Sequence, residues 1–428
     1  MKKYILIITF FTFAQYAIFA QQIEKVKTQK QAIRNKDFDS TVLKKIKEQN
    51  AYYKAEKEKN SPNKTIADKK FEMYKNIFMD HFWRLNTDWA TSAGYHLYDS
   101  ILLIPNSEQR TKELTFYTTE LEKIKKAKYD SLNDLNKIDY KILENELKRQ
   151  IWYINEFKSY EWNPAVYNIG EAFSYILSEN YAPLKNRINN FYVRLTNVPA
   201  YFEAAKQNIK NPSKEYLELA IEQNEGTIDI FEKDFIDSLK RIGLTTAQQE
   251  IYAKKSKVAA TAIRSYIQFL KDFKNENPRT FRLGNTLYAK KFDYEIQSQY
   301  SIDEILTAAL KRKDYLQTQM ETISQELWKK YFGKQTPPNN RLELIRKVID
   351  TISVQHVNAT NFRSEIEKQL PELTAFVNAK NLLYLDPTKP LKVRKEPGYM
   401  AGVAGASMSS PGPYEKKGTA YYNVGTLD

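Results

Sequence analysis

The fold class follows from one long stretch, residues 301–333, which reads SIDEILTAALKRKDYLQTQMETISQELWKKYFG. Apolar residues recur there at steps of three, four and seven, which is the spacing of one face of an α-helix. They are Ile302, Ile305, Ala309, Leu316, Met320, Ile323, Leu327 and Tyr331. Ser301 suits the N-cap, Asp303 and Glu304 lie in the first turn, and Gly333 suits the end of the helix. The stretch therefore predicts one long helix.

The same spacing extends outward over residues 65–380. Apolar residues between Tyr140 and Ile154 repeat it, and Thr246 with Gln249 predicts a capping box at the start of another helix. Because proline disfavours helix at the preceding residue, it marks the breaks between helices. Such prolines stand at 164, 183, 212, 278 and 337–338. The sequence predicts an elongated multi-helix body over residues 65–380, without a regular repeat.

The pattern changes in residues 381–428. Residues 391–394 and 419–424 alternate as strands do, and residues 411–418 lie between them as a loop or hairpin tip. Six of the twelve glycines lie between Gly398 and Gly425, which predicts tight turns and close backbone approaches. The fold class predicted is mainly α, with a small Gly-rich β-hairpin element at the C-terminus. This element is the expected functional surface.

The first 20 residues have the layout of a secretory signal peptide. Lys2 and Lys3 precede an apolar run from Tyr4 to Phe19, and Ala20 offers a small residue at the cleavage site. The run is shorter than the roughly 20 residues that a membrane-spanning helix needs. We therefore expect a soluble, exported protein, periplasmic or secreted, with no transmembrane span after cleavage.

The formal net charge is +14, and much of it is concentrated near the N-terminus. Residues 21–64 hold twelve Lys/Arg against six Asp/Glu and few apolar residues. This composition predicts a basic, polar, partly disordered extension. No aromatic-basic strand motif accompanies the charge, so nucleic acid is not an expected partner.

The candidate catalytic motifs are few. The chain contains no cysteine, which excludes disulfides, thiolate ligands, cysteine nucleophiles and acylation at cysteine within these residues. None of the three histidines, His81, His96 and His356, begins a zinc-binding helix motif. A metal site that includes His81 and His96 is one interpretation, and ordinary packing is the favoured one. Ser407 lies in a Gly-x-Ser-x sequence, but Ser409 replaces the second glycine of a nucleophile elbow, and a proline-rich segment follows.

Two segments together resemble the bacterial family called domain of unknown function 885. They are residues 82–99, FWRLNTDWATSAGYHLYD, and residues 393–424, of which VRKEPGY and GTAYYNV are the most similar parts. The resemblance spans about residues 65–428 and implies a relative of zinc metallopeptidases. In that family a His-Glu motif and a later Glu supply the metal site, beyond the position that matches Val424. Zinc is thus expected for a full-length relative, and no metal ligand or catalytic residue is assigned in this chain.

The resemblance also implies roles for residues near the C-terminus. Tyr421, Tyr422, Asn423 and Val424 would form a strand that offers backbone hydrogen bonds to an extended peptide. Further residues would lie near the cleft, namely Tyr399, Met408 and Tyr414. Arg394 and Glu396 would orient a substrate terminus, or form a plain surface ion pair. The sequence after Asn423 departs from the proline-containing continuation of the family.

Two functional hypotheses follow. The first is an N-terminal fragment of an exported zinc-metallopeptidase-like protein, inactive as given, that contacts a peptide substrate. The alternative is a non-catalytic exported helical protein that binds peptide or glycan. A fragment is expected to expose apolar surface where further helices pack, so the structure bears on the choice.

Overall fold

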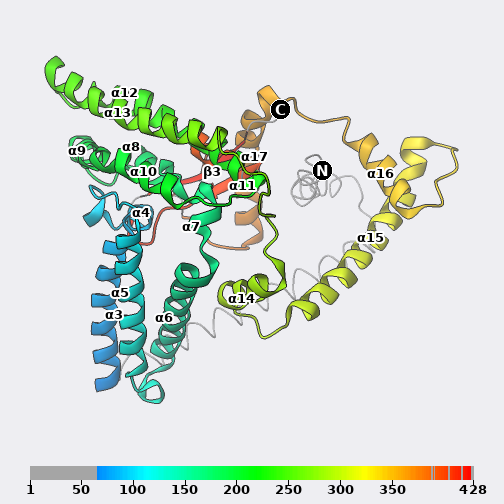
Figure 1. Cartoon of the computed structure of the whole chain (residues 1–428). Coiled ribbons are helices and arrows are strands. Elements are labelled where there is room, and N and C mark those ends of the chain that lie inside the picture. Colours follow the sequence, from blue (N-terminus) through cyan, green and yellow to red (C-terminus); the bar gives the residue numbers. More distant parts are fainter. Residues whose placement is uncertain (1–64, 387–388, 390, 403–404, 416–417, 426–428) are drawn as a thin grey trace.

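The computed structural model describes residues 65–386, 389, 391–402, 405–415 and 418–425. Helices dominate it, and a three-stranded sheet lies near the C-terminus, which confirms the predicted fold class. Figure 1 shows α3, α5 and α6 side by side as one bundle and α8 to α13 as a second helical layer above it. The predicted signal peptide and basic extension lie outside the described residues.

The helices run through the chain in the following order. They are α3 Ile66–Leu85, α4 Thr87–Ser92, α5 Ser107–Lys125, α6 Asp134–Trp152, α7 Ser159–Trp162, α8 Gly170–Ser178, α9 Leu184–Arg194, α10 Val198–Asn208, α11 Lys214–Asp229, α12 Phe235–Leu239, α13 Thr246–Lys271, α14 Gly284–Ile296, α15 Ile302–Phe332, α16 Arg341–Ile352 and α17 Phe362–Lys380. Short 3₁₀ turns include η1 His96–Tyr98 and η8 Gly398–Met400, and π-helical turns are η3 Tyr153–Phe157 and η6 Ile230–Asp234. None of these described helices has the length and apolarity needed to cross a membrane.

The long helix predicted from residues 301–333 is confirmed as α15. The Ser301 side chain accepts from the Glu304 backbone N–H, the Glu304 side chain accepts from the Ser301 N–H, and Gly333 is the C-cap. The other predicted capping box is shifted by one residue, because Thr245 and Gln248 form it rather than Thr246 and Gln249. The second case shows that the type of cap can be read correctly while its position is wrong by one residue.

Two large apolar clusters hold the helical body together. One is formed by the helices from α8 to α13 and contains fully buried aromatic residues such as Phe173, Phe191 and Phe231. The other joins α3 to α5 and α6 through residues such as Phe78 and Leu147. A buried aliphatic or aromatic side chain contributes about 1.5–3 kcal/mol, so these clusters account for the cohesion of the two layers.

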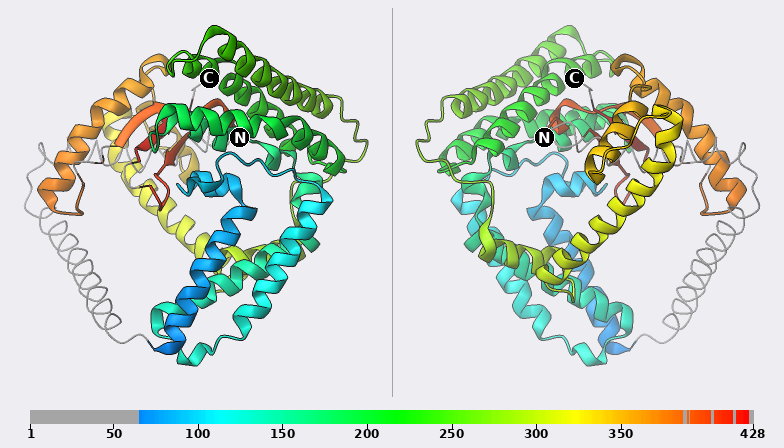
Figure 2. Two further views of the ribbon diagram at one scale, coloured as in Figure 1. Left: turned by 90° about the vertical axis from the view of Figure 1, so that its left-hand side faces the viewer. Right: turned by 90° about the vertical axis from the view of Figure 1, so that its right-hand side faces the viewer.

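The arm formed by α15 and α16 projects from this body in Figure 1, and it lies in front of the body in the right-hand view of Figure 2. A small cluster around Trp328, Leu344 and Val348 joins the two helices. The predicted apolar face of α15 is largely exposed elsewhere, including Ile305 and Leu316. The helix forms as predicted, but its apolar face is not a core face along its whole length.

The C-terminal sheet contains three strands in the order β1-β3-β2, where β1 is Leu391–Lys395, β2 is Ala406–Ser409 and β3 is Ala420–Val424. The two predicted strands, β1 and β3, do not form a hairpin with each other, because they pair in parallel; the antiparallel hairpin is formed by β2 and β3. Sequence analysis missed β2, since ASMS alternates apolar and polar residues over only four positions and contains no β-branched or aromatic residue. The strand also explains why Ser407 is not in a nucleophile elbow, which needs a turn into a helix.

Glycines let the sheet region approach the helices as closely as predicted. A Cβ on Gly226 of α11 would lie 2.2 Å from the Gly398 carbonyl oxygen. A Cβ on Gly412 would lie 2.2 Å from the carbonyl carbon of Ala93, and the Tyr414 N–H donates to the Ala93 carbonyl at 3.0 Å. No larger residue fits either position without moving the backbone apart.

Candidate functional site

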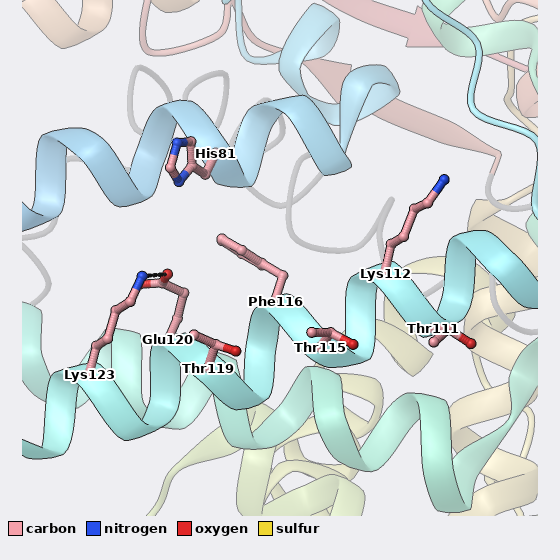
Figure 3. Close-up of a pocket in the computed structure, with 8 residues that line it drawn as sticks. All are labelled: His81, Thr111, Lys112, Thr115, Phe116, Thr119, Glu120 and Lys123. Atoms are coloured by element: carbon pink, nitrogen blue, oxygen red, sulfur yellow. Dashed lines mark hydrogen bonds and ion pairs between the residues drawn. The ribbon is translucent and has the colours of Figure 1, made fainter.

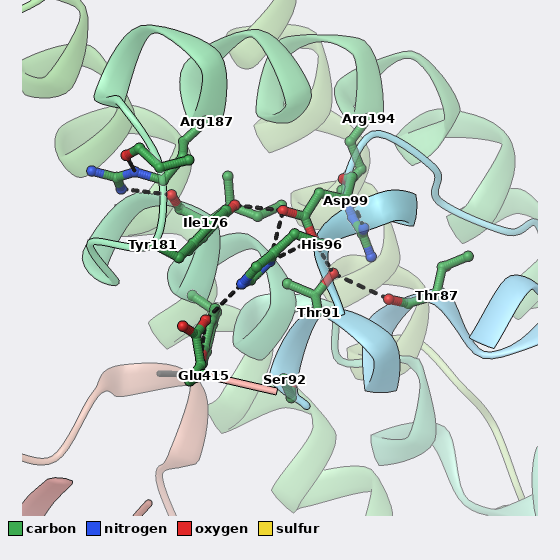
Figure 4. A network of polar contacts seen from close by, with 12 residues as sticks. Thr87, Thr91, Ser92, His96, Asp99, Ile176, Tyr181, Arg187, Arg194 and Glu415 are labelled. Carbon is green, nitrogen blue, oxygen red and sulfur yellow. Dashed lines mark hydrogen bonds and ion pairs between the residues drawn. The ribbon is translucent and has the colours of Figure 1, made fainter. Parts of the chain in front are cut away.

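The most closely connected polar site surrounds His96 (Figure 4). His96 begins η1, directly after α4, and its two ring nitrogens face two carboxylates. The Nδ1 atom lies 3.0 Å from Asp99 Oδ2, and Nε2 lies 2.6 Å from Glu415 Oε1. Because Glu415 belongs to the loop between β2 and β3, His96 links this loop to the helical body.

Hydroxyl groups complete the hydrogen bonding of both carboxylates. Tyr181 donates to Asp99 Oδ2, and Thr91 donates to Asp99 Oδ1 at 2.9 Å. Tyr175, on α8, donates to Glu415 Oε1 at 3.1 Å. The Tyr181 ring also stacks on the His96 ring, with centroids 3.3 Å apart and planes 5° from parallel. A stacked, doubly hydrogen-bonded imidazole has little rotational freedom.

Buried positive charge lies behind this site. The Arg194 side chain is fully buried, donates to the backbone carbonyl of Asp99 at 3.0 Å and pairs with Asp88. Arg187 caps the end of α8 by donating to the carbonyls of Ile176 and Leu177. Such charged donors orient the segments that carry Asp99 and Tyr181.

The site shifts the pKa of several groups. Burial lowers the pKa of His96, but hydrogen bonds and charges from Asp99 and Glu415 outweigh it, so the pKa is raised above its usual value. Burial, with the adjacent carboxylates, raises the pKa of Tyr175 and of Tyr181. The tyrosines therefore stay neutral donors, and His96 favours the protonated form in which both ring nitrogens donate.

Zinc does not fit this group of residues. Two ligands on a tetrahedral zinc at about 2.05 Å lie about 3.3 Å apart, whereas Nε2 of His96 and Glu415 Oε1 are 2.6 Å apart, as a direct hydrogen bond. No group of three or more His, Asp or Glu side chains with metal-binding geometry occurs among the described residues. The alternative metal site with His81 is not formed, since Asp99 and Glu415 take both nitrogens of His96. His81 lies on α3 and lines a hollow beside α5 (Figure 3), and His96 is not among the residues that line it.

A second polar row runs across the C-terminal sheet. Arg394 on β1 donates from Nε to Asn423 Oδ1 at 2.6 Å, and its guanidinium lies 3.9 Å from the centre of the Tyr421 ring. The fully buried Asn423 donates in turn to the hydroxyls of Ser407 and Ser409 on β2. The side chain of this central strand thus ties all three strands together.

The ion pair expected between Arg394 and Glu396 is not formed within the described part of the chain. The hydroxyl of Ser407 donates to Glu396 at 3.4 Å instead. Burial and the charge of Glu222 raise the pKa of Glu396. Its carboxylate therefore has only a weak partner, and a role in orienting a substrate terminus stays a prediction.

The other predicted residues are dispersed. Tyr399 packs against the apolar cluster of α8 to α13, and its backbone carbonyl accepts from the Asn168 side chain at 2.8 Å. The Met408 side chain on β2 is 54% exposed. Tyr414 lies beside His96, where its hydroxyl accepts from the Trp83 indole at 3.2 Å. Of these three residues, only Tyr414 belongs to the site around His96.

The position of β3 changes which backbone is available for pairing. Residues 421–424 pair with β1 on one side and with β2 on the other, so their backbone groups serve the sheet itself. The peptide-pairing role that the resemblance implies for Tyr421, Tyr422, Asn423 and Val424 does not fit a central strand. The outer edge of β2 is the alternative.

Two hollows open on the surface. One, of about 340 Å³, adjoins His96 and is lined by Gly94, His96, Glu179, Asn180, Tyr181, Tyr414, Glu415 and Gly418. The other, of about 440 Å³, lies between α3 and α5 (Figure 3) and is lined by His81, Thr111, Lys112, Thr115, Phe116, Thr119, Glu120 and Lys123. The first combines aromatic walls with the carboxylates of Glu179 and Glu415, while the second contains only one acid-base pair, Glu120 with Lys123.

Sequence reasoning missed most of the site around His96. It treated His96 as a packing residue and did not single out Asp99, Tyr175, Tyr181 or Glu415. A local signal existed, since His96 and Asp99 are three residues apart and meet across one turn. Glu415 is 319 residues from His96, and no sequence spacing reveals such a pair.

Fold and site together define a mainly helical protein in which a small mixed sheet is fastened to the helices through a histidine held between two carboxylates. The chain belongs to the family described as "Bacterial protein of unknown function (DUF885)", whose model matches residues 88–428. The resemblance stated from the two sequence segments is therefore confirmed at the level of the family. No curated protein matches the chain.

Two solved structures are similar to this one. A "putative lipoprotein of unknown function" from Shewanella oneidensis is 38% identical, with a TM-score of 0.67 over 84% of this chain and 65% of that one. A "putative lipoprotein" from Colwellia psychrerythraea is 13% identical, with a TM-score of 0.62 over 85% of this chain and 68% of that one. The second likeness concerns the fold alone. This chain spans less than two thirds of the length of the Shewanella protein.

Proposed function

We propose that this chain is the N-terminal, helical part of an exported, zinc-metallopeptidase-like DUF885 protein, and that it binds extended peptide without hydrolysing it. The observation that carries the proposal is the open edge of β2. The family membership of residues 88–428 and the sequence resemblance to metallopeptidase relatives support the catalytic class of the whole protein. Within this chain we assign binding only, because the residues around His96 do not suit zinc.

The register of the sheet identifies the backbone groups at the open edge. The Gly425 N–H donates to the Gly405 carbonyl at 2.9 Å, so this antiparallel pair is a hydrogen-bonded one. Hydrogen-bonded and non-hydrogen-bonded pairs alternate, and Met408 lies opposite Tyr422 in a non-hydrogen-bonded pair. Ala406 and Met408 consequently direct their N–H and C=O groups away from β3.

These outward groups have no backbone partner in another described segment. An exposed strand edge pairs readily with an extended peptide, because the peptide completes the unpaired hydrogen bonds. Met408 adds a flexible, exposed apolar side chain that adapts to different peptide side chains. We infer that backbone pairing supplies the affinity and that side-chain selectivity is low. The glycan alternative stays a prediction without a specific observation in its favour.

The proposal includes export. The first 20 residues have the composition of a signal peptide, and both similar structures are described as those of putative lipoproteins. Because these 428 residues contain no cysteine, we propose the exported form without acylation at cysteine. When the chain is expressed from residue 1, we expect it to be secreted with cleavage after residue 20. N-terminal sequencing of the secreted protein should then begin at Gln21.

Peptide binding to residues 21–428 tests the site. The probe is a fluorescein-labelled pool of random hexapeptides, and the measurement is fluorescence anisotropy. Met408→Pro removes the outward N–H without breaking the ladder to β3, since proline is tolerated at such edge positions. We expect binding about tenfold weaker, which corresponds to one lost hydrogen bond.

Met408→Ala is the matched control, because it removes the same side chain and keeps the N–H. It is expected to bind within about twofold of the wild type. Equal binding by the proline variant, or no binding by the wild type, would refute the edge-strand site. One tightly bound zinc per chain, removable with loss of peptide hydrolysis, would refute the non-catalytic assignment.

A further inference from the structure

The N-terminal half of α15 carries an apolar face that no described element covers extensively. Its exposed members are Ile305, Leu306, Leu310 and Leu316, and we call them the α15 stripe. At 100° per residue the four side chains fall within about 140° of the helix circumference. Leu306 and Leu310 are each 54% exposed. A face of this width is typical of a helix that packs against another element.

The stripe continues directly into an existing helix contact. Farther along the same face of α15, Trp328 is buried against Leu344 and Val348 of α16. At the start of α16, Arg341 donates to Asp314 and Gln317 of α15. This helix therefore covers α15 only from about that point to its C-terminus. One periodic face is thus half occupied by a helix and half vacant among the described residues.

The vacant half has the dimensions of another helix contact. Residues 302–317 of α15 span about 24 Å at 1.5 Å per residue. The arm holds this segment away from the two helical layers (Figure 1). Of the described elements, α16 alone packs extensively against α15. The surface is accessible to a segment of similar length.

The Shewanella protein indicates where such a segment comes from. This chain covers 65% of it, so about a third of that relative has no counterpart in the alignment. The shared part is 38% identical and includes most of this chain. An exposed helix face that continues an existing interface is suited to receive such additional structure.

We propose that the α15 stripe is the docking face for a helical segment equivalent to the part of the Shewanella relative that this chain does not cover. The inference rests on the proposed function in one respect, since both take this chain as the helical part of a larger DUF885 protein. It names the surface and its partner: an amphipathic helix of about 16 residues whose apolar face meets aliphatic side chains.

Capture of that segment tests the proposal. Overlapping labelled peptides that cover the unmatched part of the Shewanella protein are titrated with residues 21–428 of this chain. Leu306→Glu combined with Leu310→Glu places two charges in the stripe and is expected to weaken binding at least tenfold. Tyr315→Glu is the matched control, because Tyr315 is 51% exposed on the same helix but lies outside the stripe. Circular dichroism confirms that all variants retain their helices.

Three outcomes would overturn the proposal. They are no binding by the wild type, equal binding by the double variant and the wild type, and equal weakening by Tyr315→Glu. Concentration-dependent dimerisation of the wild type that the double variant abolishes would assign the stripe to a second copy instead. The Met408→Pro experiment tests the edge of β2, and the Leu306→Glu/Leu310→Glu experiment tests the α15 stripe. Because these are different surfaces, failure of the proposed function and failure of the docking proposal can be distinguished.

Discussion

The contact between Gly226 and Gly398 makes Gly226→Ala a stringent test of the fold. In the interior of α11, alanine is about 1 kcal/mol more favourable than glycine. The added Cβ, however, lies 2.2 Å from the Gly398 carbonyl oxygen, about 1 Å inside van der Waals contact. Overpacking of this kind costs about 1–3 kcal/mol.

Relief of the overlap requires η8 to move away from α11. That movement weakens the hydrogen bonds from Asn168 to the Tyr399 carbonyl and from Gln223 to the Ala401 carbonyl, at about 1 kcal/mol each. The losses exceed the gain in helix propensity, so we expect Gly226→Ala to lower the free energy of unfolding by about 2–3 kcal/mol.

Urea unfolding followed by circular dichroism measures this change. Hydrogen exchange of residues 391–402 and 420–424 then shows whether the sheet loosens first. Glu218→Ala is the control, because Glu218 is exposed on the same helix and such substitutions usually change stability by about 0.5 kcal/mol or less. A Gly226→Ala protein as stable as the wild type, or more stable, would refute the close approach of η8 to α11.

Three further predictions concern buried polar groups. Because the pKa of His96 is raised, its stabilising contribution is full below about pH 6.5 and is lost as pH rises through the folded-state pKa. The free energy of unfolding of the wild type should therefore be lower at pH 8.5 than at pH 5.5. If the His96→Gln variant shows the same pH dependence as the wild type, His96 is not its cause. Burial raises the pKa of Asp68, but hydrogen bonds led by the Asn133 backbone N–H outweigh it and lower the pKa. The ionised Asp68 therefore stabilises the fold above about pH 4, and this stabilisation is lost at lower pH. Asp68→Asn is expected to cost about 2 kcal/mol at pH 7 in urea unfolding, and a neutral effect would show that the carboxylate is not needed there. Tyr181→Phe leaves buried Asp99 one donor short and is expected to cost about 1–3 kcal/mol in the same assay, with wild-type stability as the contrary result.

Local features were predictable from the sequence because their causes are local. The start and end of α15 follow from Ser301, Glu304 and Gly333, which lie within one turn of the boundaries they set. Helical spacing also identified the apolar face of α15. It did not reveal which half of that face is covered, because this depends on how far α16 extends along the helix.

Features that join distant segments were not predictable in the same way. Strand β2 forms because β3 and the Asn423 side chain lie beside it, whereas its own short alternation, without β-branched or aromatic residues, is a weak strand signal. The central position of β3 depends on the parallel pairing of β1, which spacing alone does not specify. The two carboxylates at His96 come from a neighbouring turn and from a loop far along the chain, and only the nearer one left a trace in the sequence.

The long separation between His96 and Glu415 has a consequence for the order of folding. Their contact closes a loop of more than three hundred residues, whereas the contacts within α3 to α6 span far fewer. Loop-closure entropy and contact order place such a contact late in folding. During synthesis the histidine, Asp99 and Tyr181 are present long before the ribosome adds Glu415. Before Glu415 arrives, the helical layers therefore hold Asp99 with His96, Tyr181 and Thr91, and the loop between β2 and β3 completes the site later.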